Sequence, residues 1–235
     1  MSAEVLAHSS RGTRRSRRPK RGGDAGRSER ERPAGPFVLY VEGPRDRDLL
    51  RIWARRLSHG LARALESCVV IMGGRQPARA AEHFERVHGG RDDVSGLIVL
   101  DRDHHDPADD WGSTALLDLF TWPRRHIESY VLVPAAIRRA AGYAPDDQRF
   151  DRLLAQHLPD VGDASALLDL DAKRLLAVKG PLARGLGQPL STADIARCMR
   201  LDEVHADVIG VLERVGAALG QSGAEPEIVV RSRPQ

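Results

Sequence analysis

Cysteine is nearly absent from this sequence, and long hydrophobic runs are missing. Cys68 and Cys198 are the two cysteines among 235 residues, and they lie in separate strand-like and helix-like segments. We therefore expect both thiols to be reduced, in a cytoplasmic protein. No run approaches the roughly 18 apolar residues of a membrane span. The N-terminal Arg clusters are not followed by the apolar segment of a signal peptide, so no membrane association is expected.

Positive charge is unevenly distributed along the chain. Residues 1–34 contain ten Lys or Arg and four Asp or Glu, which gives this tail a net charge of +6. The whole chain carries +3, so the pI of 9.2 reflects the tail, and residues 35–235 carry about −3. With almost no apolar residues, the tail is expected to be disordered. It is either a nucleic-acid-binding arm that acts through counterion release or a solvated extension, including a start codon assigned too far upstream.

Three strand-and-helix units are predicted after the tail. The strands are the apolar runs at 37–41, 68–74 and 96–100, and the second ends in a turn at Gly73 and Gly74. Apolar residues spaced by three and four predict one helix from about 46 to 65, and Pro77 begins another that ends near residue 88. A short helix near 114–120 and a fourth strand-like segment at 126–133 are expected next.

Strands that are apolar on both faces and alternate with helices indicate an α/β protein with a parallel sheet. From Pro134 onward the pattern becomes helical, with Gly and Pro between the segments. The predicted organisation is a disordered basic tail (1–34), a parallel-sheet core flanked by helices (35–133), a helical C-terminal section (134–222) and a flexible end (223–235).

Carboxylates follow two of the predicted strands directly. Glu42 comes after the first strand, and Asp101 and Asp103 come after the third. Alternation along an extended backbone places Asp101 and Asp103 on the same side, with Arg102 opposite. Parallel sheets bind ligands at the carboxyl ends of their strands, so neighbouring first and third strands would bring the three carboxylates together.

Carboxylates that close together repel one another unless a cation lies between them. Magnesium prefers oxygen ligands, and a bound ion activates water and stabilises the charge on a phosphate during transfer. The pattern therefore predicts a site for Mg²⁺ or Mn²⁺ formed by Glu42, Asp101 and Asp103. The alternative is that each acid caps a helix or pairs with a nearby arginine such as Arg45, Arg47 or Arg102.

Three blocks of sequence resemble a known family. "VLYVEGPRD" (38–46) followed by "LIVLDRD" (97–103) resembles the TOPRIM domain of topoisomerases, primases and several nucleases. "WPRRHIESYVLVPAAI" (122–137) is similar to a block of TOPRIM proteins in the overcoming-lysogenization-defect (OLD) nuclease group, especially the stand-alone DUF4435 branch. "DLDAKRLL" (169–176) resembles a downstream lysine motif of that group. The chain departs from the family pattern at Ala172, where Gly is usual, and at Ser129, where Asn is usual.

The resemblance implies a TOPRIM-like core and roles for further residues. Lys173 would join Glu42, Asp101 and Asp103 in catalysis by stabilising charge in the transition state; its alternative is an ordinary surface lysine. Asp46 and Glu128 would add metal ligands. The alternative for Asp46 is a helix cap, and the alternative for Glu128 is an ion pair with Arg124 or Arg125.

Other polar residues have less specific patterns. Arg75, Arg124 and Arg125 are candidates for binding a nucleic-acid backbone, although solvated arginines are the default. His104 and His105 lack the spacing of a zinc site, so a hydrated acidic loop is expected there; Asp106 would assist the metal only weakly.

The implied function is a Mg²⁺- or Mn²⁺-dependent nuclease that acts on DNA or RNA, as an effector in antiphage defence. No GxxxxGK[ST] motif occurs, so a partner ATPase of the ABC type would be a separate chain. A regulatory module that holds a metal or nucleotide without cleaving is the alternative. Primase- or topoisomerase-type chemistry ranks below both, because no zinc ribbon or catalytic tyrosine context is visible.

Overall fold

A computed structural model describes residues 36–102, 111, 114–159 and 163–221. The predicted basic tail (1–34) and the predicted flexible end (223–235) fall outside these residues. Asp103, His104, His105 and Asp106 also fall outside them.

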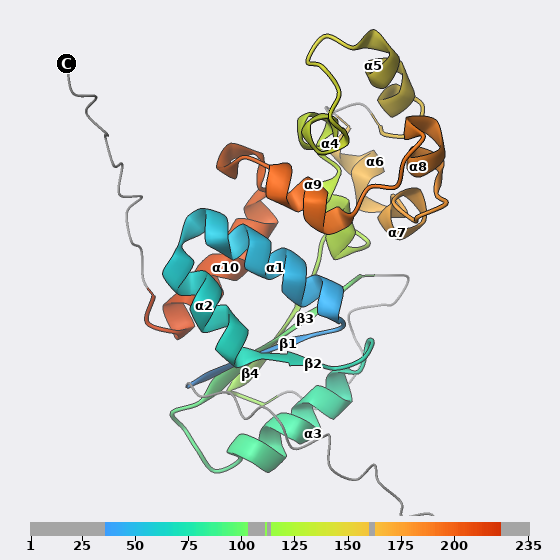
Figure 1. The fold of residues 1–235 in the computed structure, drawn as a ribbon. Helices are drawn as coiled ribbons and strands as arrows, with labels where there is room; N and C mark the ends of the chain where they lie inside the picture. The colour runs from blue at the N-terminus through green and yellow to red at the C-terminus, as the bar shows by residue number, and fades with distance from the viewer. Residues whose placement is uncertain (1–35, 103–110, 112–113, 160–162, 222–235) are drawn as a thin grey trace, which may run out of the picture. The chain divides into compact units, whose positions relative to one another are not determined.

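Four parallel strands form one sheet in the described part of the chain, in the order β2-β1-β3-β4 (Figure 1). Their bounds are Phe37–Val41 (β1), Val69–Ile71 (β2), Ser95–Leu100 (β3) and Leu117–Thr121 (β4). In the central pair, Phe37 lies opposite Ser95 and Val41 lies opposite Val99. The α/β fold class with a parallel sheet, flanking helices and a helical C-terminal section is confirmed.

Both faces of the sheet are buried, as the apolar strands predict. Leu39 and Val41 pack on one face with α1 (Pro44–Leu57), α2 (His59–Cys68) and α10 (Ala206–Ala218). Val38 and Tyr40 point to the other face, where α3 (Pro77–His88) covers them (Figure 1). The alternation of side chains along β1 therefore divides the core into two layers.

The first helix is interrupted, which the apolar spacing did not predict. Ser58 has an extended backbone, with φ −160° and ψ 136°, and separates α1 from α2. Its hydroxyl oxygen accepts hydrogen bonds from the N–H groups of Gly60 and Leu61, so Ser58 is the N-cap of α2. The predicted single helix from 46 to 65 is wrong in this respect.

Two further element predictions are wrong. The segment near 114–120, predicted as a helix, contains strand β4, which pairs with β3 along its whole length. The segment at 126–133, predicted as a strand, forms the 3₁₀ helix η1 (Ile127–Val131), in which every residue is buried. An apolar segment buried on all sides has no periodicity that separates a strand from a helix.

The remaining described elements are helical. They are α4 (Pro134–Ala141), α5 (Gln148–Ala155), α6 (Ala164–Leu168), α7 (Ala172–Leu175), α8 (Pro181–Leu186), α9 (Thr192–Cys198) and the 3₁₀ helix η2 (Leu201–Glu203), before α10. Within the described ranges, no helix has the length and apolar character needed to span a membrane.

Candidate metal centre

Glu42 and Asp101 meet where the strand order changes direction. From β1 the chain continues to β2 on one side, and then to β3 on the other side, so β1 and β3 flank the switch point. Glu42 follows β1, Asp101 follows β3, and the backbone N–H of Asp101 donates to Glu42 Oε1 at 2.7 Å. Open α/β sheets bind their ligands at this position. The predicted convergence of these two residues is therefore present in the structure.

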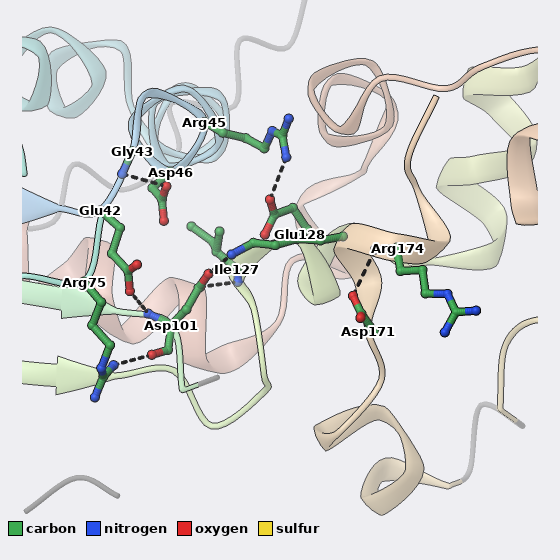
Figure 2. Close-up of polar contacts among 11 residues, drawn as sticks. Glu42, Gly43, Arg45, Asp46, Arg75, Asp101, Ile127, Glu128, Asp171 and Arg174 are labelled. Carbon is green, nitrogen blue, oxygen red and sulfur yellow. Dashed lines mark hydrogen bonds and ion pairs between the residues drawn. The ribbon is translucent and has the colours of Figure 1, made fainter. Parts of the chain in front are cut away.

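The loop after β2 binds the backbone of both residues. Gly73 and Gly74 adopt φ values of 83° and 126°, which an L side chain rarely adopts, and their N–H groups donate to the Glu42 carbonyl at 3.0 and 2.9 Å. Arg75 Nη1 donates to the Asp101 carbonyl at 2.6 Å. The glycine turn predicted from the sequence thus helps to position the site, and Arg75 contacts it directly (Figure 2).

The carboxylate of Asp101 is 2% exposed and has a partner on each oxygen. Oδ1 accepts from the backbone N–H of Ile127 at 2.8 Å, and Oδ2 pairs with Lys173 Nζ at 2.6 Å. Ile127 belongs to η1 and Lys173 to α7, so Asp101 links the sheet to the helical part of the chain. The Lys173 side chain is 42% exposed, but its ammonium group contacts the site.

Asp46 caps helix α1, which is one of the two roles that the sequence left open, and its role as a metal ligand stays a prediction. It lies in the first turn of α1, and its Oδ2 accepts from the backbone N–H of Gly43 at 3.1 Å, so it caps the helix. Burial, followed by the charges of Asp101 and Glu128, raises the pKa of Asp46 from 3.8 to about 7. A carboxylate next to other carboxylates is thus driven towards its neutral form near neutral pH.

Glu128 is buried in η1, with 2% of the residue exposed. Its Oε1 pairs with Arg45 Nη1 at 3.1 Å, so Arg45, and not Arg124 or Arg125, is its cationic partner (Figure 2). Its Oε2 has no hydrogen-bond partner among the described residues. A buried carboxylate oxygen without a hydrogen bond is costly unless a ligand completes its contacts, which fits a cation site.

The described carboxylates gather in one region but do not form a closed cage of ligands. Figure 2 shows Glu42, Asp46, Asp101 and Glu128 in one region beyond the ends of β1 and β3. No group of three or more His, Cys, Asp or Glu side chains in the described ranges has the geometry of a metal cage. Magnesium binds through one or two carboxylates and keeps several waters, so this oxygen-rich set suits Mg²⁺ or Mn²⁺ better than zinc. Asp103 lies outside the described residues.

Arg124 and Arg125 lie beside the site but contact the protein itself. Arg124 Nη1 donates to the Ser129 carbonyl at 2.8 Å, and its guanidinium lies 4.8 Å from the centre of the Tyr130 ring. Arg125 Nη1 lies 3.7 Å from Asp171 Oδ2. These contacts stabilise the segments around η1 and α7, and a role in nucleic-acid binding stays a prediction.

Three contributions to the site were not predicted from the sequence. The pairing of Arg45 with Glu128 joins residues 83 positions apart, and the Ile127 N–H belongs to a segment predicted as a strand. Arg102 donates to the Leu168 carbonyl at 2.8 Å and pairs with Asp169. Because backbone donors and distant partners leave no local pattern, the sequence alone did not indicate these contacts.

No protein-family model and no curated protein sequence matches the chain. Among solved structures, the C-terminal region of the Burkholderia pseudomallei OLD protein is similar, with 17% identity and a TM-score of 0.47, over 79% of this chain and 98% of that chain. The C-terminal region of the Xanthomonas campestris pv. campestris OLD protein matches with 15% identity and a TM-score of 0.42, over 79% of this chain and 94% of that chain. With TM-scores below 0.5, we draw no functional conclusion from this likeness.

Proposed function

We propose that this protein is a metal-dependent nuclease that hydrolyses phosphodiester bonds in DNA or RNA with a TOPRIM-type acidic site. The observation that carries the proposal is the buried Glu128 Oε2, which lacks a hydrogen bond in the described structure and lies among further carboxylates at the switch point of the sheet. A buried carboxylate oxygen that lacks a hydrogen bond and lies among further carboxylates is expected at a functional site that binds a cation.

Each residue has a role that follows from its position. Glu42, Asp101 and Glu128 would hold Mg²⁺ or Mn²⁺, with Asp46 beside them and Asp103 as a further ligand. The bound ion would supply an activated water and stabilise the charge that develops on the phosphate. Arg45, whose side chain is 61% exposed, and Lys173 place positive charge at the rim of the acidic set, where a phosphate would approach.

The test is cleavage of plasmid DNA and of tRNA by the full chain in Mg²⁺, in Mn²⁺ and in EDTA. We expect cleavage with metal, none in EDTA, and a loss of about 100-fold or more in Glu42→Gln and in Asp101→Asn. Asp48→Asn is the matched control, because Asp48 is a partly exposed carboxylate on α1 that pairs with Arg47 at 2.9 Å. Cleavage that persists in EDTA or in both site variants would reject the mechanism.

One observation favours a second candidate function, a module that holds a metal or nucleotide without cleaving. Asp101 Oδ2 already has a cationic partner in Lys173, so the site is neutralised in part without any metal. Calorimetry with Mn²⁺ separates the two functions. Metal binding without turnover on any nucleic acid would favour the non-cleaving module.

We also propose that an ABC-type ATPase acts with this protein in antiphage defence. The 235 residues contain no GxxxxGK[ST] motif, so such an ATPase would lie outside this sequence. The test begins with whether an ABC-type ATPase is encoded beside this chain; that ATPase is co-expressed with the tagged full chain, followed by co-purification and phage challenge. Separate elution and unchanged phage growth would argue against the partnership.

A further inference from the structure

Asp101 is bound at every polar group that it has. Its N–H donates to Glu42 Oε1, and its carbonyl accepts from Arg75. Its two carboxylate oxygens accept from the Ile127 N–H and from Lys173 Nζ. Glu42 and Arg75 contact the Asp101 backbone, and the Ile127 N–H that binds Oδ1 is neutral. Lys173, in contrast, places a positive charge 2.6 Å from Oδ2. The position that a cation would take at this oxygen therefore already has a charged occupant.

A metal ion and the Lys173 ammonium would repel each other if both were bound to Asp101 Oδ2. Mg²⁺ binds carboxylate oxygen at about 2.1 Å, so two positive centres would lie within a few ångströms of each other beside a carboxylate that is buried. Like charges at this separation repel strongly where screening is weak. Binding of the ion at this oxygen and retention of the ion pair are therefore competing states.

Lysine is an uncommon choice in this chain. Of its 36 Lys and Arg residues, three are lysines, at positions 20, 173 and 179. An arginine would offer a rigid planar fork to Asp101, whereas the lysine ammonium is compact and sits on a flexible four-carbon stem. The buried carboxylate of Asp101 is therefore paired with a lysine, whose ammonium can move away by rotation of its flexible side chain.

The backbone that carries Lys173 is held in place independently of the ammonium group. Arg102 and the Arg125 N–H both donate to the Leu168 carbonyl at 2.8 Å. Asp171 caps α7 by accepting from the Arg174 N–H at 2.9 Å, and it also lies 3.7 Å from Arg125 Nη1. Release of the ammonium therefore requires no displacement of α7.

We propose that Lys173 is a built-in counter-ion that occupies Asp101 in the metal-free protein and is displaced when a divalent cation binds. The displaced ammonium, on a side chain that is 42% exposed, becomes available to a phosphate group. Metal loading and exposure of a phosphate-binding cation are then one coupled event. This regulation rests on the proposed function, because it takes the acidic set to be a metal site.

The first test is calorimetry of Mn²⁺ binding to the full chain at pH 8. Lys173→Met and Lys173→Gln are expected to bind Mn²⁺ about tenfold more tightly than wild type, because the competing charge is gone. Lys173→Arg keeps a cation and is expected to stay within about threefold of wild type. The matched control is Lys179→Met, since Lys179 is an exposed lysine that lies six residues further along the chain, after α7.

The second test needs no variant. In pulse labelling with an amine-reactive acylating reagent, read by mass spectrometry, Lys173 should be protected in EDTA and become several-fold more reactive in Mg²⁺. The reactivity of Lys179 should not change. This measurement stands even if the Lys173 variants fail to fold.

The outcomes separate the two proposals. Equal Mn²⁺ affinity in wild type and in both neutral variants, with unchanged labelling of Lys173, overturns the counter-ion proposal and leaves the nuclease proposal intact. Absence of Mn²⁺ binding in every protein overturns the metal site itself, and the counter-ion proposal with it. Tighter binding in the neutral variants together with metal-dependent labelling supports both.

Discussion

The side chain of Glu42 binds the backbone of Asp101: the Asp101 N–H donates to Glu42 Oε1 at 2.7 Å. The two residues are 59 positions apart in the sequence, and each follows one of the two central strands. One carboxylate oxygen of Glu42 is thus used to hold the neighbouring acidic residue. Glu42 therefore has a structural role in addition to its proposed role as a ligand.

The two roles of Glu42 are separable by substitution. Glu42→Gln keeps an acceptor for the Asp101 N–H, so its free energy of unfolding should lie close to that of wild type. Glu42→Ala leaves this N–H without its partner and should lose about 1–3 kcal/mol. Both should lose nuclease activity. Chemical denaturation in EDTA and plasmid cleavage give the two readouts, and equal stability of the two variants would contradict the structural role.

Asp46 should make the stability of the metal-free protein depend on pH. Its pKa is about 7 in the folded chain and near 3.8 when unfolded, so between these values the folded state holds a proton that the unfolded state releases. Its contribution to the free energy of unfolding therefore falls as pH rises from about 4 to about 7, and is constant above that range.

Asp46→Asn removes this titration but keeps an oxygen that can accept from the Gly43 N–H. The variant should gain stability relative to wild type as pH rises, by about 2–4 kcal/mol at pH 8 compared with pH 4. Urea denaturation in EDTA at several pH values measures the difference. EDTA is needed because a bound cation would favour the ionised carboxylate. A difference that does not change with pH would show that the pKa of Asp46 is not raised in the folded chain.

Arg45 and Glu128 should be energetically coupled. Arg45→Met leaves a buried carboxylate without its ion-pair partner, so it should be destabilising by about 1–3 kcal/mol, and Glu128→Gln should relieve part of that loss. A double-mutant cycle measures the coupling, which we expect at about 1 kcal/mol because Arg45 is largely exposed. The exposed Arg47–Asp48 pair is the control, with a coupling below about 0.5 kcal/mol.

The glycine turn after β2 should matter for activity as well as stability. Gly74 has φ 126°, so Gly74→Ala is strained and should lose about 1–3 kcal/mol. Cleavage should fall about tenfold or more, because the turn binds the Glu42 carbonyl and places Arg75 on Asp101.

Gly90→Ala is the matched control for this variant. Gly90 also has a positive φ, of 77°, but lies in the loop after α3. Its substitution should destabilise the protein while cleavage by the folded fraction is unchanged. Melting temperature and single-turnover cleavage provide the comparison, and equal losses of activity in the two variants would remove the positioning role of the turn.

The sequence predicted the part of the site that depends on strand ends. An apolar run followed by Glu42, and another followed by Asp101, is visible locally, and parallel strands bring their carboxyl ends to one edge. The turn at Gly73 and Gly74 was also predicted from local sequence, because two glycines after an apolar run are typical of a turn. These predictions needed only local pattern and the general geometry of parallel sheets.

The remaining parts depend on tertiary contacts. Segment 126–133 reads as a strand, yet it is a buried 3₁₀ helix whose first N–H binds Asp101. The strand β4 was predicted as a helix. It is an edge strand of five residues, and so short a segment shows little hydrophobic periodicity in its sequence. The interruption at Ser58 comes from a single capping hydroxyl within a continuous apolar pattern. In each case a contact outside the segment decided its structure.

The contacts of Asp101 also have a consequence for folding order. Its partners Glu42, Ile127 and Lys173 are 59, 26 and 72 residues away along the chain. Closing loops of this length carries an entropic cost that is recovered only when the sheet, η1 and α7 have all come together. No stretch of the chain shorter than residues 42–173 contains all of these partners. During synthesis, the contacts of Asp101 therefore cannot be complete until Lys173, which neutralises its carboxylate, has also been made.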